Sequence, residues 1–362
     1  MGSSTGRLGG SGGPSGGLLT AVLTVVVVGL GFVVVTRTME TARLVEAIRT
    51  ADHRLLVLAV GVYALSWPLR GRRYGDVLHA MGHRRETGYL TALVLLSQTA
   101  NLVVPARAGD GVRAYFLNEH REVPYATGGA SLAVERLFDL LALTALGLAA
   151  LLVLWAWGDP LLGAEAGRYL LGAGVVAGLA LLLTAGLLVV ARSGGTARSS
   201  LAGLLDRLPL DSLADALRRA GGNVRTVVGD SWALATIGIG SLLVWGLDVL
   251  TAVVVLAALS SGALSLPSLL AVGTLAVTVG NLAKVLPLTQ GGIGLYEAAF
   301  TAVVVALSPL GASVALAAAI CDHGLKNAVT LAGGLLAGVG LNVSLPTSGG
   351  DLDGEDAEPA DF

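Results

Sequence analysis

The chain has 362 residues, of which 54% are hydrophobic and 13% are charged, and its formal net charge at pH 7 is −2. Several apolar runs are long enough to cross a hydrocarbon core of about 30 Å, so the composition predicts an all-α polytopic membrane protein whose function lies in its helix bundle. The single Cys321 excludes an internal disulfide framework. No Cys/His cluster has the spacing of a zinc site, and we expect neither a metal nor a cofactor.

The first half of the chain alternates apolar runs with charged segments. Residues 1–17, rich in Gly and Ser, are predicted to form a flexible tail. The segments expected next are a transmembrane helix over 18–36, a mixed-charge linker over 37–52, a helix over 54–69, a basic loop over 70–85, an apolar run over 88–105, a charged segment ending at Pro124, and long helices over 126–157 and 167–191. The positive-inside rule places the short basic loop in the cytoplasm.

The second half has the same alternation. Residues 192–230 are again basic, and the apolar residues of 201–217 have helical spacing, which predicts an amphipathic helix on the cytoplasmic membrane surface. The segments expected after this loop are a helix over 231–259, an apolar run over 266–307 that is broken near Pro287, a helix over 311–341 and an acidic disordered tail over 342–362.

The two basic loops lie on one side of the membrane only if an even number of crossings separates them. We therefore expect 88–124 to enter and leave from the cytoplasm as a re-entrant hairpin, and 266–307 to do the same from outside. This predicts about six full crossings plus two re-entrant hairpins in a cell-membrane protein with both termini in the cytoplasm. The membrane domain over 18–341 then contains an inverted repeat, with one copy at about 54–157 and the other at about 231–341.

Ionisable and polar residues cluster beside the two broken apolar runs. Such residues are costly at membrane depth, so they are candidate substrate-binding residues, whereas no catalytic residue is recognised. The candidates are Asn101, Arg107, Asp110, Arg113, Glu135, Arg136 and Asp139 in the first copy, and Asn281, Lys284, Gln290, Glu297 and His323 in the second. The matched positions of the two copies are Asn101 with Asn281, Pro105 with Pro287, Gly109 with Gly291 or Gly292, and Glu135–Arg136 with Asp322–His323.

Two interpretations of the first cluster remain open. Arg107, Arg113 and Arg136 supply bidentate donors suited to a phosphate, which favours a phosphate-bearing lipid headgroup as ligand. Alternatively, the charges form buried structural pairs, such as Arg136 with Asp139 one helical turn away. We expect Asp110 to pair with Arg107 or Arg113.

The second cluster leaves similar alternatives. Glu297 is a candidate for proton coupling, or else a partner of Lys326 or Arg136. Asp248 is expected to pair with Lys284 or Lys326, or to be protonated, because an unpaired carboxylate in a helix is expensive in the membrane. His323 is either a group that titrates near neutrality or a hydrogen-bonded packing residue.

Three ordered motifs resemble the transmembrane region of the lysylphosphatidylglycerol synthase family, also called the flippase-like domain family. The motif residues are Asn101, Pro105, Arg107, Gly109, Asp110 and Arg113; then Ser131, Glu135, Arg136 and Asp139; then Pro287, Gln290, Gly291, Gly292, Gly294 and Glu297. The resemblance covers about residues 20–341. It implies a membrane bundle with re-entrant segments, to which some members add a cytoplasmic aminoacyl-transferase or, in archaea, a glycosyltransferase domain. The chain departs from the family at Asp110, where relatives tend to have Glu, and at His323, where the second copy often has Arg.

The resemblance implies translocation without synthesis, because neither appended domain is recognised. The implied substrate is an anionic phospholipid, such as an aminoacylated one, or a polyprenyl-phosphate-linked sugar. The alternatives are an intramembrane enzyme that acts on a lipid phosphate, and a membrane scaffold for a partner glycosyltransferase. Membrane lipids are expected partners in each case, and nucleic acid is not.

Overall fold

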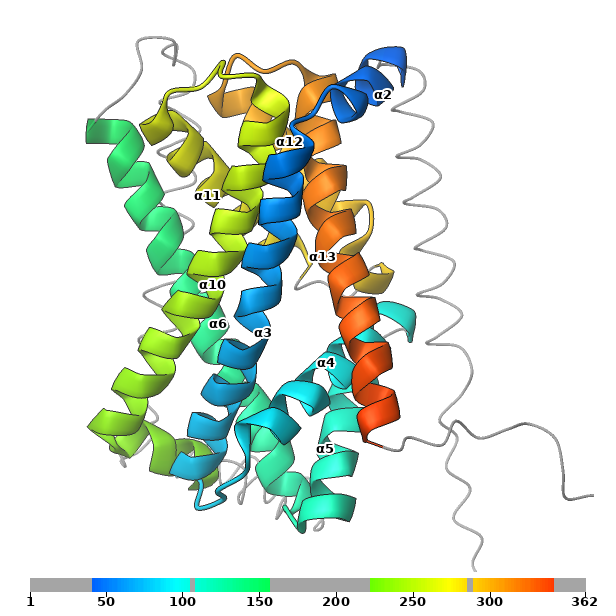
Figure 1. Cartoon of the computed structure of the whole chain (residues 1–362). Helices are drawn as coiled ribbons and strands as arrows, with labels where there is room; N and C mark the ends of the chain where they lie inside the picture. The colour runs from blue at the N-terminus through cyan, green and yellow to red at the C-terminus, as the bar shows by residue number, and fades with distance from the viewer. Residues whose placement is uncertain (1–40, 105–107, 157–221, 285–288, 342–362) are drawn as a thin grey trace, which may run out of the picture.

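The computed structural model describes residues 41–104, 108–156, 222–284 and 289–341, and every regular element in these ranges is helical (Figure 1). The elements are α2 (Thr41–Arg49), α3 (His53–Ala80), α4 (Thr87–Val103), α5 (Ala108–Arg121), α6 (Tyr125–Ala156), α10 (Ser231–Ser260), α11 (Leu266–Ala283), the 3₁₀ turn η2 (Gln290–Gly292), α12 (Leu295–Leu307) and α13 (Ala312–Gly340). Helices α6, α10 and α11 and the segment Gln290–Leu307 are long and apolar enough to cross a membrane. The predicted class, an all-helical membrane protein, is confirmed, and the number of crossings stays a prediction.

The basic loop predicted over 70–85 is wrong for most of its length, because α3 continues to Ala80. Asp52 starts this helix by accepting a hydrogen bond of 2.8 Å from the backbone N–H of Arg54. Arginine favours helices almost as strongly as leucine does, so the change from apolar to basic residues at Arg70 does not end the helix. Similarly, the predicted linker 37–52 contains α2, and the charged segment before Pro124 forms α5.

Some predictions concern residues outside the described ranges. These are the tail 1–17, the helices over 18–36 and 167–191, the amphipathic segment 201–217, the tail 342–362 and the motif residues Pro105, Arg107 and Pro287.

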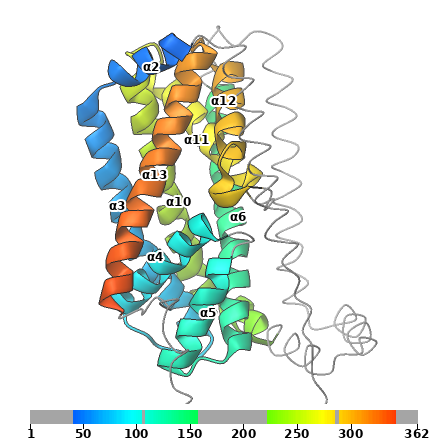
Figure 2. The ribbon, with the colours of Figure 1, turned by 90° about the vertical axis from the view of Figure 1, so that its right-hand side faces the viewer.

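The described helices form two sets with the same pattern of packing, α3–α6 and α10–α13. In the first set α3 packs on α4, α4 on α5 and α5 on α6; in the second, α10 packs on α11, α11 on α12 and α12 on α13. Across the sets, α4 packs on α13 as α11 packs on α6, and α3 lies along α10. Figures 1 and 2 show α4 and α5 at one end of the bundle and α11 and α12 toward the other, so neither helix pair extends over the full height.

Close approach between helices depends on glycines at the crossings. A Cβ on Gly71 of α3 would lie 2.7 Å from the backbone nitrogen of Thr91 in α4, and one on Gly109 of α5 would lie 2.7 Å from that of Asn101. Small residues at such crossings let backbones pack closely, which matters in lipid because burial of apolar surface gives little driving force between helices. The glycines therefore let α3 pack closely on the start of α4, and the start of α5 pack closely on the end of α4.

We predict that Gly71→Ala lowers the free energy of unfolding by about 1–3 kcal/mol, because the added methyl group overlaps the backbone of α4. The measurement is unfolding of the purified protein in detergent. Gly61→Ala in the same helix is the matched control, since a Cβ there meets nothing within 4 Å. Equal stability of the two variants would contradict the close crossing of α3 and α4.

Candidate functional site

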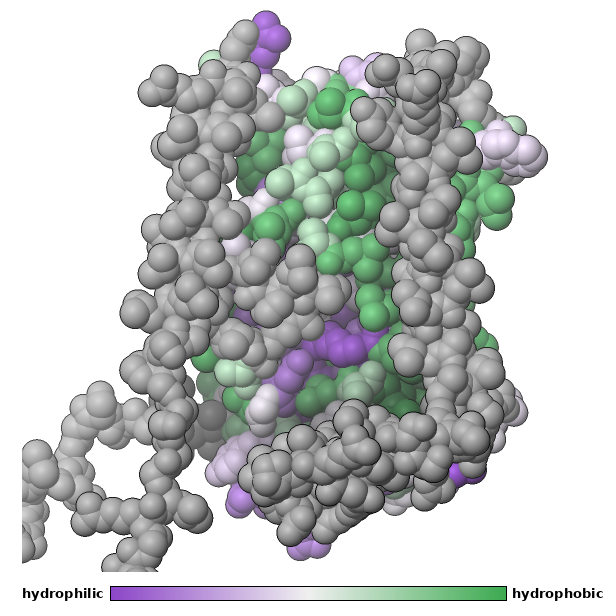
Figure 3. All heavy atoms as spheres, turned by 180° about the vertical axis from the view of Figure 1, so that it is seen from behind, coloured by the Kyte–Doolittle hydropathy of each residue, from purple (hydrophilic) through white to green (hydrophobic). Residues whose placement is uncertain are grey.

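A cavity of about 370 Å³ lies where the ends of α4 and α11 meet the middle of the long helices. Its lining comes from both helix sets: α3, α4 and α6 from the first, and α10, α11, η2 and α13 from the second. Figure 3 shows hydrophilic residues gathered in a recess that is bordered by apolar side chains. The polar lining is therefore set into an apolar bundle, as a binding site for a polar group within a membrane requires.

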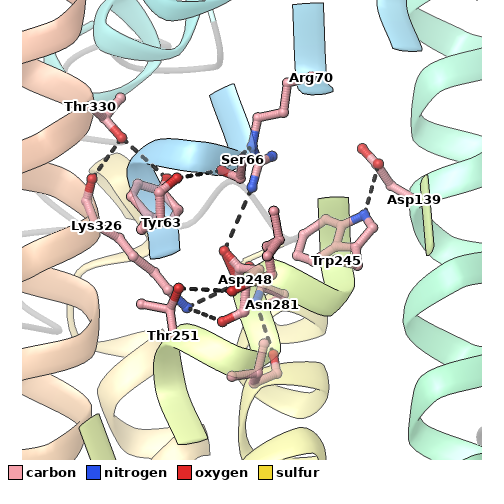
Figure 4. Close-up of polar contacts among 12 residues, drawn as sticks. Tyr63, Ser66, Arg70, Asp139, Trp245, Asp248, Thr251, Asn281, Lys326 and Thr330 are labelled. Carbon is pink, nitrogen blue, oxygen red and sulfur yellow. Dashed lines mark hydrogen bonds and ion pairs between the residues drawn. The ribbon is translucent and has the colours of Figure 1, made fainter. Parts of the chain in front are cut away.

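Beside the cavity, the first set holds a buried network of four charged side chains. Arg73 donates to Glu135 at 2.7 Å and to Asp139 at 2.5 Å, and Arg113 donates to the second oxygen of Glu135 at 2.5 Å. Both guanidinium groups are almost completely buried. Trp245 of α10 donates its indole N–H to Asp139 at 2.8 Å, which ties this network to the second set (Figure 4). Two arginines against two carboxylates leave the network electrically balanced, which offsets part of the cost of burying charge.

Arg136 is more accessible than the buried Arg73 and Arg113. Its side chain is 33% exposed and lines the cavity. It lies 3.2 Å from Asp110 of α5 and 3.5 Å from Asp139 on its own helix. Asp110 also accepts a hydrogen bond of 3.1 Å from the amide of Asn101. Asp110 thus pairs with Arg136; of its two predicted partners, Arg113 is held by Glu135 instead, and Arg107 lies outside the described residues.

The second set has its own buried network around Lys326 of α13. The Lys326 ammonium lies 3.0 Å from Asp248 of α10 and 3.0 Å from Asp322 one turn earlier on α13. Asp322 also accepts a hydrogen bond of 2.5 Å from the hydroxyl of Tyr296. The predicted pair of Asp248 and Lys326 is present in the structure.

Arg70 of α3 reaches across to the second set. Its guanidinium lies 3.6 Å from Asp248 (Figure 4). It also lies within 6 Å of the ring centroids of Tyr63, Trp67 and Trp245. Cation–π contacts of this kind stabilise a partly desolvated charge. Arg70 is therefore a cavity-lining cation held between aromatic rings and a carboxylate.

The last charged pair joins the start of α12 to α13. Glu297 accepts a hydrogen bond of 2.7 Å from the backbone N–H of Gly294 and lies 2.6 Å from His323 Nδ1. Glu297 thus caps its own helix and pairs with His323, so the predicted pair with Lys326 or Arg136 is wrong, while the alternative role in proton coupling stays a prediction.

The contacts of the two sets correspond position by position. Glu135 of α6 binds Arg113 of α5, and Asp322 of α13 binds Tyr296 of α12. Each acid thus contacts the second helix of the pair α4–α5 or α11–α12. One residue later, Arg136 binds Asp110 of α5 and His323 binds Glu297 of α12. One turn after the acids, Asp139 binds Arg73 of α3 and Lys326 binds Asp248 of α10, which are the first helices of the two sets. The predicted match of Glu135–Arg136 with Asp322–His323 therefore extends to the contacts that these residues make.

The cavity brings together most of the predicted site residues. Those that line it are Asn101, Glu135, Arg136, Asp139, Asn281, Lys284, Gln290 and His323. Three others, Asp110, Arg113 and Glu297, do not line it and instead bind residues that do. Arg107 lies outside the described residues.

Sequence reasoning missed Arg70 and Arg73, which it assigned to a loop, and the aromatic side chains around Arg70. One signal was available: Glu135 and Asp139 lie one turn apart in an apolar helix, and buried carboxylates need cationic partners. Within the described ranges, no group of three or more His, Cys, Asp or Glu side chains is arranged to hold a metal ion.

We predict that Arg73→Gln lowers the free energy of unfolding by about 3–5 kcal/mol, because it leaves the buried Asp139 and Glu135 with fewer cationic partners. The neighbouring Arg72 is exposed, so Arg72→Gln is the matched control and should change stability little. The test is the midpoint of thermal unfolding of each protein in the same detergent. Similar midpoints for the two variants would show that the buried network contributes little to the fold.

Comparisons with known proteins agree with this architecture. A family model described as the lysylphosphatidylglycerol synthase TM region matches residues 21–334. The chain is also similar to the glycosyltransferase AglD of Haloferax volcanii, with 39% identity over 348 residues, which cover 91% of this chain and 56% of that protein. The chain thus spans about half the length of this curated relative. Because the family model covers most of the chain, the protein belongs to the family of the lysylphosphatidylglycerol synthase transmembrane region.

Proposed function

We propose that this protein moves a phosphate-bearing anionic lipid between the two leaflets of the cell membrane. The headgroup passes through the cavity between the two helix sets while the acyl or prenyl chains stay in lipid. The lipid is an aminoacylated phospholipid or a polyprenyl-phosphate-linked sugar. The observation that carries the proposal is a polar cavity of about 370 Å³ that is lined by both helix sets inside an apolar bundle.

The charges of the lining favour an anion. Four lining residues are basic (Arg70, Arg136, Lys284 and Lys326) and three are acidic (Glu135, Asp139 and Asp248). Arg136 is the more exposed of the two described arginines that line the cavity, and its buried Nε has no hydrogen-bond partner in the described structure. A guanidinium with an unused donor is suited to bind a phosphate oxygen.

The membrane arrangement is part of the proposal. The pairs α4–α5 and α11–α12 are re-entrant hairpins that enter from opposite sides, in a bundle of about six crossings with an inverted repeat. The repeated packing and the placement of the two pairs toward opposite ends of the bundle support this (Figures 1 and 2). The end with α4, α5 and the start of α10 faces the cytoplasm, because Arg84, Arg85 and Arg121 lie near that end. Both termini are on the cytoplasmic side in this proposal.

We assign no covalent chemistry to the cavity. Its three carboxylates are paired: Glu135 with Arg73 and Arg113, Asp139 with Arg73, and Asp248 with Lys326. Carboxylates held in this way do not serve readily as proton acceptors in a reaction. The glycosyltransferase name of the relative supports a sugar-linked lipid as the cargo, and a glycosyltransferase as the partner of this chain.

The test is transport in liposomes that contain a fluorescent, headgroup-labelled lipid, either an anionic phospholipid or a short polyprenyl-phosphate sugar. Dithionite, which does not cross the bilayer, reports how much label reaches the outer leaflet. Loss of a charge-assisted hydrogen bond of about 1.5–3 kcal/mol predicts that Arg136→Gln slows transport about 10- to 100-fold.

Arg84→Gln is the control, because Arg84 is exposed and does not line the cavity. Both variants are first compared with the wild type in thermal unfolding. A folded wild type that moves neither lipid, or an Arg136→Gln variant as fast as the wild type, would contradict the proposal. Intact function without Arg136 would favour the scaffold role.

A further inference from the structure

Beside its charged residues, the cavity is lined by side-chain amides that the proposed phosphate contact does not use. They come from α4, α11, η2 and α13, so both helix sets contribute to them. The amide residues are Gln98, Asn101, Asn281, Gln290 and Asn327. An amide carries N–H donors and a carbonyl acceptor, so it is suited to a partner that both accepts and donates hydrogen bonds.

Two of these amides make no hydrogen bond within the described structure. They are the side chains of Gln98 in α4 and Asn327 in α13, which line the cavity and are partly exposed. The amide of Asn101, by contrast, donates to Asp110 at 3.1 Å. Gln98 and Asn327, named here the amide pair, can therefore bind a ligand through both ends of each amide.

The amide pair lies where α4 packs on α13. At this place Thr99 donates to the backbone carbonyl of Thr330 at 2.9 Å. Gln98 precedes Thr99 in the chain, and Asn327 lies one helical turn before Thr330, which also lines the cavity. Residues three apart on a helix are neighbours on its surface. The pair thus joins one amide from each helix set at a single contact between helices.

A chain of contacts connects the amide pair to the proposed phosphate site. Asn101 lies one turn after Gln98 on α4, and its amide donates to Asp110. Asp110 in turn lies 3.2 Å from the guanidinium of Arg136. The amide pair and Arg136 therefore belong to neighbouring parts of one lining, so a headgroup bound at Arg136 can extend toward the amides.

The acids of the lining are not available to a cationic headgroup. Glu135 and Asp139 are both held by Arg73, and Asp248 is held by Lys326. The ammonium of an aminoacyl group only donates hydrogen bonds, and it would add a positive charge to a lining with more basic than acidic residues. An uncharged group next to the phosphate avoids this repulsion.

We propose that Gln98 and Asn327 form a subsite for an uncharged sugar that is linked to the phosphate bound by Arg136. A sugar hydroxyl both donates and accepts, so it matches both ends of an amide. The cavity volume of about 370 Å³ is at the lower end of the range of about 300–1,000 Å³ for small-molecule sites, which favours a small headgroup. The inference rests on the proposed function and selects the sugar-linked lipid from its two substrates.

The subsite is tested by calorimetry on the purified full chain in detergent, without transport. A short-chain prenyl-phosphate hexose is compared with a matched phosphodiester in which a methyl group replaces the sugar. The two ligands carry the same phosphate charge, so the difference in affinity reports the sugar. Because each amide adds at least one hydrogen bond, the hexose ligand should bind about 10- to 100-fold more tightly. A short-chain aminoacylated phosphatidylglycerol should bind more weakly than the hexose ligand.

Variants separate the subsite from the phosphate site. Gln98→Met and Asn327→Leu remove the amides at similar side-chain size. Each should weaken binding of the hexose ligand about three- to tenfold and leave that of the methyl diester unchanged. Neither should lower the unfolding temperature much, because neither removes a hydrogen bond of the described structure. Arg136→Gln should weaken both ligands alike. Asn223→Leu is the control, because its amide donates to Thr127 outside the cavity.

Equal affinity of the wild type for the hexose and methyl ligands, tighter binding of the aminoacylated lipid, or amide variants that weaken both diesters alike would overturn the proposal. The liposome assay separates this proposal from the transport function. If the hexose ligand binds through the amide pair but no lipid moves, the sugar subsite stands and the transport function fails. If lipid moves at a rate that depends on Arg136 but both amide variants bind the hexose ligand as the wild type does, the transport function stands and the subsite fails.

Discussion

The pairing of charges inside an apolar bundle is the constraint on which this structure depends. Every charged side chain in the two central networks has a partner of opposite sign on another helix or one turn away. Burying one of these charges alone costs several kcal/mol, so each partner is required once the other is present. The networks therefore hold the helices in one arrangement while the closely packed glycines set the distances between them.

The cations fall into two groups by accessibility. Arg73 and Arg113 are buried, have carboxylate partners and support the carboxylates of α6. Arg136 and Arg70 lie at the cavity, with one-third and 13% of their side chains exposed. The buried arginines thus hold the carboxylates of α6 in place, and the partly exposed ones provide the positive charge of the cavity lining. This division keeps the lining charged while the shape of the cavity is fixed by other residues.

The two helix sets share a geometry but not a chemistry. At corresponding places the first set has an arginine with an aspartate and the second has a histidine with a glutamate. The same is true one residue earlier, where Glu135 binds an arginine and Asp322 binds a tyrosine hydroxyl. The two sets therefore fill the same places in the bundle with different donors and acceptors.

Hydropathy is a local property, and for that reason the sequence by itself determined the helical membrane class and the two broken apolar runs beside the charged motifs. The family followed from the resemblance of three ordered motifs, which are also local patterns. The helices over 125–156, 231–260 and 312–340 were predicted to within two residues at their ends. The partners of the charges were not predictable in this way, because Arg73 and Asp139 are 66 residues apart and Asp248 and Lys326 are 78 apart. Arg70 and Arg73 were assigned to a loop because a count of basic residues does not reveal whether a carboxylate lies across the helix interface. Only the tertiary structure decided which arginines are buried supports and which line the cavity, since that depends on how helices distant in sequence pack together.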